Sequence, residues 1–195
     1  MLNPVKIIKH HLFWAGLPLA LIVLINGANV RTEALSEEQD AELAIEQGLS
    51  LHSRGEYEKA VELFKRSIAI KPTARGQTYL AWSLSYLGKL DQAIEEARKA
   101  IELAPDFGNP YNDIGAYYIE KGLYDEAIPF LEKAMKAKDY CCYYYPHFNL
   151  GRIYALKEDY ARAIEQFERA LKIEPNYLPA VLAIIFLRGK IEKSL

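Results

Sequence analysis

The sequence has little cysteine and lacks the motifs that hold a haem or a phosphate group. Its two cysteines, Cys141 and Cys142, are adjacent, and only one histidine, His147, stands near them. A zinc site needs further Cys or His ligands at suitable spacing, and neither a Cys-x-x-Cys-His motif nor a Gly-rich phosphate loop occurs. We therefore expect no metal and no cofactor. A disulfide between these neighbours would close a strained eight-membered ring, which is rare, so it is not expected. We interpret the two cysteines as small packed residues, with an intermolecular disulfide as the alternative.

Catalytic residues and a basic surface are also missing. His52 and His147 have no nucleophile or carboxylate in a triad-like arrangement with them. The 24 basic residues are outnumbered by 26 acidic ones and form no basic stripe, so a nucleic-acid partner is not expected. Most carboxylates fall in patterns typical of a solvated helix face. The sequence predicts a protein that is not an enzyme.

The N-terminal region contains no acidic residue before Glu33. Fourteen apolar, glycine or proline residues follow one another from Leu12 to Ile25, with Lys6 and Lys9 before them. Basic residues before an apolar segment and acidic residues after it predict a cytoplasmic N-terminus and an extracytoplasmic body. Residues 1–30 are therefore predicted to be a membrane anchor or a signal peptide.

Two interpretations of this segment stay open. The nineteen residues Leu12–Val30 are just long enough for a single spanning helix, which we favour. A cleaved signal peptide, with the protein released to the periplasm, is the alternative, although the possible cleavage sites at Gly27 and Ala28 are mediocre. A lipoprotein anchor is excluded because this segment has no cysteine.

A pattern of small and large residues recurs in the rest of the chain. Residues 144–175 contain Leu150-Gly151-x-x-Tyr154, then Ala163-x-x-x-Phe167, then Pro175. Small residues leave room where two helices cross, and a proline ends a helix. Related series occur three times upstream. The alanines that mark the second half of each series are spaced 33, 34 and 36 residues apart, at Ala60, Ala93, Ala127 and Ala163.

This pattern resembles the tetratricopeptide repeat, a helix–turn–helix unit of about 34 residues. The resemblance implies an all-α, right-handed superhelical solenoid with four repeats, and its first helix should begin near Glu37 because Ser36-x-x-Gln39 is a capping box. The expected boundaries are a linker at 31–40, repeats at about 41–73, 74–107, 108–143 and 144–176, and a capping helix at 177–195. The expected packing residues are Gly48, Ala60, Phe64, Ala81, Ala93, Gly115, Ala127, Gly151, Tyr154, Ala163 and Phe167.

The first helices of such repeats line a concave groove, which suits an extended segment or an amphipathic helix of a partner. The groove should contain few basic residues, so a clamp for a C-terminal carboxylate is not expected. By helical period, the partner-binding residues of the groove are Ile45, Leu49, Arg75, Trp82, Tyr86, Asn109, Asn112, Tyr145, Phe148 and Arg152.

Two further features stand out from a regular solenoid. The joint before the fourth repeat has two extra residues and a cluster of aromatic residues between Tyr140 and Phe148, which either fill the gap or face a partner. The capping helix starts as an apolar run, whereas solenoid caps normally have a polar outer face. Either it folds back over the fourth repeat or it binds another protein or another copy, through Leu178, Val181, Leu182, Ile185 and Phe186.

Together these features predict a membrane-tethered scaffold that holds other proteins in an extracytoplasmic or membrane complex. A factor that assembles an envelope machine is the alternative, because the lengthened joint is similar to one in type IV pilus pilotins. An accessory subunit of a membrane enzyme complex is a second alternative.

Overall fold

The computed structural model of the chain describes residues 19–193. Every helix or strand assigned within these residues is an α-helix, which confirms the all-α prediction, and one isolated β-bridge joins Phe107 to Asp139. The chain divides into two units, Met1–Gln39 and Asp40–Leu195. The helices are α1 (Leu19–Ser53), α2 (Tyr57–Ile70), α3 (Ala74–Tyr86), α4 (Leu90–Leu103), α5 (Gly108–Glu120), α6 (Tyr124–Ala134), α7 (Tyr144–Leu156), α8 (Tyr160–Ile173) and α9 (Leu178–Glu192).

Helix α1 differs from the expected arrangement. It runs without interruption from Leu19 to Ser53, so the predictions of a separate N-terminal helix and of a helix start near Glu37 are wrong. The physical reason is that no proline lies between these residues and most of them are good helix formers. The part of the Leu12–Val30 segment before Leu19 is outside the described residues. Over residues 19–193, no helix has both the length and the apolar composition that a bilayer crossing requires.

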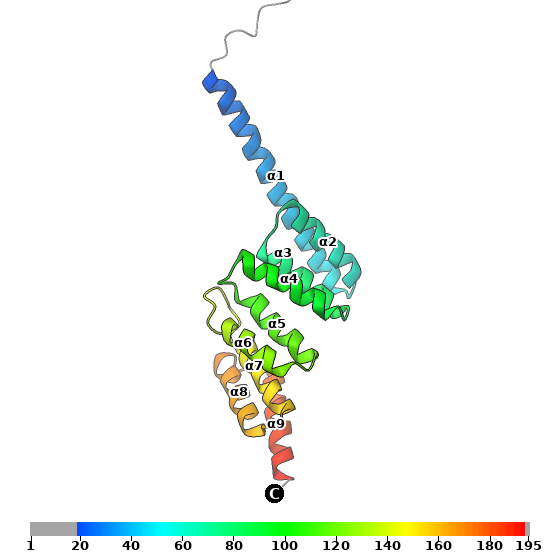
Figure 1. The fold of residues 1–195 in the computed structure, drawn as a ribbon, viewed down its shortest axis with the longest axis vertical. Coiled ribbons are helices and arrows are strands. Elements are labelled where there is room, and N and C mark those ends of the chain that lie inside the picture. The colour runs from blue at the N-terminus through cyan, green and yellow to red at the C-terminus, as the bar shows by residue number, and fades with distance from the viewer. Residues whose placement is uncertain (1–18, 194–195) are drawn as a thin grey trace, which may run out of the picture. The chain divides into compact units, whose positions relative to one another are not determined.

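The second unit is built from helical hairpins that follow one another in chain order (Figure 1). Helix α3 packs on α4, α5 on α6 and α7 on α8, and α9 packs on α8. Three of the turns between paired helices contain a glycine in the left-handed region, with φ values of 78° at Gly55, 73° at Gly88 and 75° at Gly122. Glu158 takes the same conformation in the fourth turn, with φ 61°. Glycine is favoured there because it has no Cβ.

The small residues of the repeats lie where the helices of a hairpin approach most closely. A Cβ atom added to Gly151 would lie 2.5 Å from the Phe167 ring, and one added to Gly48 would lie 2.6 Å from the Phe64 ring. The other expected packing residues are buried as well, except for Tyr154, which is half-buried. In three of the four hairpins an aromatic or leucine side chain (Phe64, Leu131 or Phe167) therefore packs on a glycine. In the second hairpin the buried Ala97 stands at the position of that large residue.

The joint between α6 and α7 is fixed to the start of α5. The amide of Gly108 donates to the carbonyl of Asp139 at 2.9 Å, and the amide of Asp139 donates to the carbonyl of Asp106 at 3.0 Å. This bridge brings the Tyr140 ring against Gly108, where a Cβ atom would lie 2.5 Å from it. The two extra residues of the joint thus place an aromatic ring at the N-terminal end of α5.

The two cysteines lie in the same joint. The structure joins Cys141 to Cys142 by a disulfide, so the interpretation of these residues as separate packed thiols is wrong. They are outside any helix, where the backbone is free to bring two neighbouring side chains together.

Candidate functional site

The first helices of the second, third and fourth hairpins lie side by side, with contacts from α3 to α5 and from α5 to α7. A hollow of about 380 Å³ opens between them and the joint. We call it the groove pocket. It is lined from α3 by Thr78, Tyr79 and Trp82, from α5 by Asn109, Asn112 and Asp113, from the joint by Tyr140 and Cys142, and from α7 by Tyr145.

Helix α5 supplies the polar side of the groove pocket. Asn109, Asn112 and Asp113 are three and four residues apart, so they share one helix face. The amide of Asn149 on α7 donates to Oδ1 of Asn112 at 3.0 Å, and the guanidinium of Arg152 donates to Oδ1 of Asn149 at 3.0 Å. A connected row of amide groups therefore crosses from α5 to α7.

Asp113 is the acidic residue of the groove pocket. Burial raises the pKa of Asp113 to about 7. A side-chain hydrogen bond from Asn112 favours the charged carboxylate and lowers the pKa, but its effect is smaller. The neighbouring Tyr117 and Tyr140 have raised pKa values, first because of their own burial and then because the Asp113 carboxylate is near. Within the described part of the chain, no lysine or arginine forms an ion pair with Asp113. The carboxylate is therefore poorly compensated.

Aromatic rings form the wall on the α3 side. Trp82, which is 39% exposed, stacks on the imidazole of His52 with ring centroids 4.1 Å apart. Tyr86 meets the same imidazole edge-on at 5.0 Å and stacks on Tyr57 at 4.8 Å. His52 is held by a hydrogen bond between Nδ1 and Oγ of Ser83 at 2.9 Å, and burial lowers its pKa. These contacts fix the indole of Trp82 at the edge of the groove pocket.

The predicted aromatic cluster at the joint divides into two roles. The Tyr143 hydroxyl donates to the carbonyl of Ala137 at 2.7 Å, so Tyr143 packs within the joint. Tyr140 is buried in the joint and also lines the groove pocket. Tyr145 is exposed and lines the groove pocket. Phe148 is half-buried and packs on Phe167 and Tyr177.

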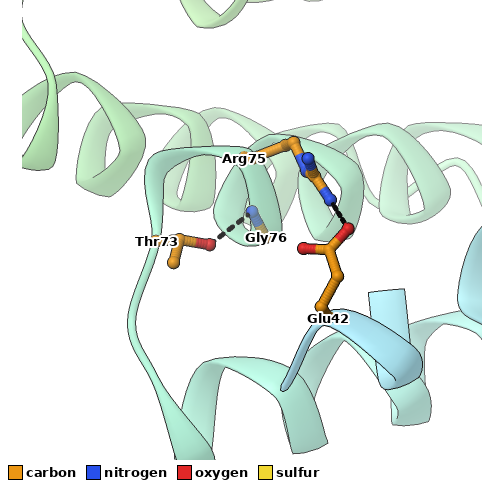
Figure 2. A network of polar contacts seen from close by, with 4 residues as sticks. All are labelled: Glu42, Thr73, Arg75 and Gly76. Carbon is orange, nitrogen blue, oxygen red and sulfur yellow. Dashed lines mark hydrogen bonds and ion pairs between the residues drawn. The ribbon is translucent and has the colours of Figure 1, made fainter. Parts of the chain in front are cut away.

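Six of the ten predicted groove residues do not line the groove pocket, namely Ile45, Leu49, Arg75, Tyr86, Phe148 and Arg152. Ile45 is only 2% exposed and belongs to the core, so its prediction as a partner-binding residue is wrong. Its side chain belongs to a core cluster that includes Phe64 of α2 and Leu80 of α3. Leu49 is half-buried against the same core. Arg75 is exposed and pairs with Glu42, beside the hydrogen bond from the amide of Gly76 to the capping oxygen of Thr73 (Figure 2).

The tail helix α9 packs on the fourth repeat with only one of its faces. Ala180, Ile184 and Leu187 of α9 are buried with residues of α8, whereas Leu178, Leu182, Ile185 and Phe186 are exposed. Val181 is half-buried. Phe186 also lines a second hollow of about 370 Å³ together with Arg152 and Leu156 of α7. The two faces of α9 thus have opposite environments, and only one of them is covered by described residues.

Two residues of the site were absent from the sequence prediction. The sequence pattern alone does not distinguish Asp113 from the many other carboxylates, although it directly follows Asn112 on the predicted groove face. Asn149 was passed over although it follows Asn112 by 37 residues, close to one repeat length. The repeat spacing therefore indicates that Asn149 occupies the same position in the fourth repeat as Asn112 does in the third.

These features define a class of protein, an α-helical solenoid of hairpins whose first helices share one groove. Tetratricopeptide repeat profiles match residues 43–78, 74–107, 109–140 and 144–177. The chain belongs to the tetratricopeptide repeat family.

Relatives share this architecture. Heat shock protein STI1 of Saccharomyces cerevisiae is 30% identical over 93 residues, which are 47% of this chain and 16% of the yeast protein. The chain thus spans about a sixth of that relative's length. A structure of pilF from Pseudomonas aeruginosa aligns with a TM-score of 0.74 at 25% identity, over 81% of this chain and 72% of that one. A structure of PilW, described as a widely conserved type IV pilus biogenesis factor, aligns with a TM-score of 0.67 at 21% identity, over 73% and 66% of the two chains.

Over the described residues, no group of three histidine, cysteine or carboxylate side chains gathers in the way that metal ligands do. The groove pocket offers amide donors and acceptors, aromatic faces and one carboxylate.

Proposed function

We propose that the groove pocket binds an extended segment of a partner protein, and that the chain is a non-catalytic scaffold. The observation that carries this proposal is that the partly exposed amide of Asn109 lines the groove pocket together with the exposed rings of Trp82 and Tyr145. Asn112 and Asn149 are buried and bonded to each other, so they hold α5 and α7 together. Side-chain amides offer both a donor and an acceptor to a peptide backbone. Aromatic rings offer rigid apolar surface to its side chains. This combination fits an extended peptide better than a small polar metabolite.

Binding of a randomised library of twelve-residue peptides to the full chain tests the groove. We expect Trp82→Ala to weaken binding by about tenfold or more, because a central aromatic anchor is typical of residues that dominate binding. Leu103→Ala is the matched control, since Leu103 is an exposed apolar residue on α4, away from the groove pocket. If no peptide binds, or if both variants bind alike, the groove is not the recognition surface.

We further propose that α9 offers a second surface, for an amphipathic helix of a partner. Ile185 follows Gly151 by 34 residues, and Leu182 follows Phe148 by the same interval. Gly151 and Phe148 are the residues of α7 that contact Phe167 on the second helix of their hairpin. By repeat spacing, Ile185 and Leu182 of α9 correspond to the residues of α7 that pack against α8. Within the described residues, no helix follows α9 to pack against them in the same way.

The second candidate function is the assembly of an envelope machine. The likeness to pilF, at 25% identity over 81% of this chain, favours it. In this case the partner would be a pilus or secretin component that is bound transiently. Copurification separates the two candidates, because a scaffold keeps its partners through gradient centrifugation, whereas an assembly factor releases them.

The membrane tether remains a proposal supported by the sequence alone. The apolar run Leu12–Ile25, with lysines before it and acids after Arg31, is the supporting observation. We expect the full chain to sediment with membranes and to be released by detergent but not by high salt. N-terminal sequencing should find residues 12–30 retained. A soluble chain that begins between Ala28 and Ala34 would instead establish cleavage of a signal peptide.

A further inference from the structure

Three aromatic rings and one carboxylate line the groove pocket, and we call these four residues the cage. Trp82 comes from α3, Asp113 from α5, Tyr140 from the joint and Tyr145 from α7. Four different segments of the chain thus contribute to one hollow of about 380 Å³. We propose that this cage holds a basic side chain, a lysine or an arginine, of the bound segment. The inference rests on the proposed function of the groove.

Charge complementarity is the first argument. A carboxylate that is taken out of water is unfavourable unless a cation or hydrogen bonds compensate it. Asp113 receives one side-chain hydrogen bond, from Asn112, and that bond does not prevent burial from raising its pKa to about 7. Neither arginine that was predicted for the groove lines the groove pocket: Arg75 pairs with Glu42, and Arg152 donates to Asn149. A cation from a partner would supply the missing charge.

The aromatic rings are the second argument. A lysine or arginine head group is attracted to the face of a tryptophan or tyrosine ring, and the attraction is larger where water is excluded. Trp82 is held in place by its stack on His52, and Tyr145 by its contacts with Tyr144 and Tyr177. The rings are therefore oriented before any ligand arrives. An acidic side chain would meet the Asp113 carboxylate and would be repelled.

The groups that face Asp113 do not favour another occupant. On its own helix these are Asn109, Asn112 and Tyr117, and the neighbouring elements contribute Thr78, Trp82, Tyr140 and Tyr145. None of these residues is a lysine, arginine or histidine, so the Asp113 carboxylate has no cationic neighbour among the residues that line the groove pocket. An apolar side chain would leave it uncompensated, whereas an ammonium or guanidinium forms a charge-assisted hydrogen bond with it.

Peptide pools that differ at one central position test the cage. Four pools carry arginine, its neutral isostere citrulline, lysine or its neutral isostere norleucine, and binding to the full chain is measured at pH 8. We expect the arginine and lysine pools to bind about tenfold more tightly than their neutral counterparts. Asp113→Asn should remove most of this difference, and Trp82→Leu should reduce it.

The control is Asp125→Asn, which removes an exposed carboxylate on α6 that pairs with Lys157 and should leave the preference unchanged. Equal binding of charged and neutral pools, with Trp82→Ala still weakening all of them, would overturn the cage but not the groove. A preference that persists in Asp113→Asn would also overturn it. Absence of binding by every pool would overturn the proposed function itself.

Discussion

Replacement of Gly151 by alanine is expected to lower the free energy of unfolding by about 1–3 kcal/mol. An alanine is normally favoured over glycine inside a helix, by about 1 kcal/mol. Here the added Cβ atom would lie 2.5 Å from the Phe167 ring, so either the ring or α8 must move. Phe167 is almost fully buried, which leaves little room for that movement. Thermal and denaturant unfolding of the full chain, followed by circular dichroism, measures the effect.

Gly189 provides the matched control for this change. It also lies inside a helix, α9, but a Cβ atom there would meet nothing within 4 Å. Gly189→Ala should therefore stabilise the chain by up to about 1 kcal/mol. The same chemical change is expected to have opposite signs at the two positions. Stabilisation by both substitutions would show that α7 and α8 do not cross at Gly151.

The double substitution Ile185→Ser with Phe186→Ser is expected to abolish binding of an amphipathic helix to α9 while stability is nearly unchanged. The two side chains are 64% and 66% exposed, so the folded chain loses little when they are removed. Each is worth about 1.5–3 kcal/mol when a partner buries it completely. Binding of designed amphipathic helical peptides to the full chain should therefore fall by more than about tenfold.

Ile184→Ser is the control for the tail. Ile184 precedes Ile185 in the sequence but lies on the buried face of α9, with 8% exposure. That change places a hydroxyl in the core beside α8, and we expect it to cost about 2–4 kcal/mol of stability. If the Ile185 and Phe186 substitutions lower the stability by a similar amount, the tail is a cap for the fourth repeat. If they alter neither stability nor binding, the face of α9 has no role as an interface.

The sequence predicts those features of the fold that depend on neighbours within one repeat. The contact of Gly151 with Phe167 follows from spacing, because a small residue and a large one recur at nearly constant intervals. The left-handed turns at Gly55, Gly88 and Gly122 follow from glycine itself. Such signals are local, so a single sequence contains them.

Features that depend on contacts between repeats are harder to predict. Ile45 has the helical position of a groove residue, yet packing of α3 against α1 buries it. The importance of Asp113 depends on the joint, which brings Tyr140 toward α5 through backbone hydrogen bonds between residues far apart in the chain. The predicted start of α1 near Glu37 is wrong for another reason. A capping-box sequence at Ser36 favours a helix start, but it does not prevent a helix that began earlier from continuing through it.

The backbone bridge between Asp106, Gly108 and Asp139 has a mechanical consequence. Each repeat of a solenoid contacts only its neighbours, so its resistance to stretching depends on the contacts within and next to that repeat. The two hydrogen bonds of this bridge connect the beginning of the third repeat to its end, beside the groove pocket. Under tension the coil should therefore stretch first at other repeats, and the spacing between α5 and α7 should be the last to change. A ligand held there would be released late when the array is pulled.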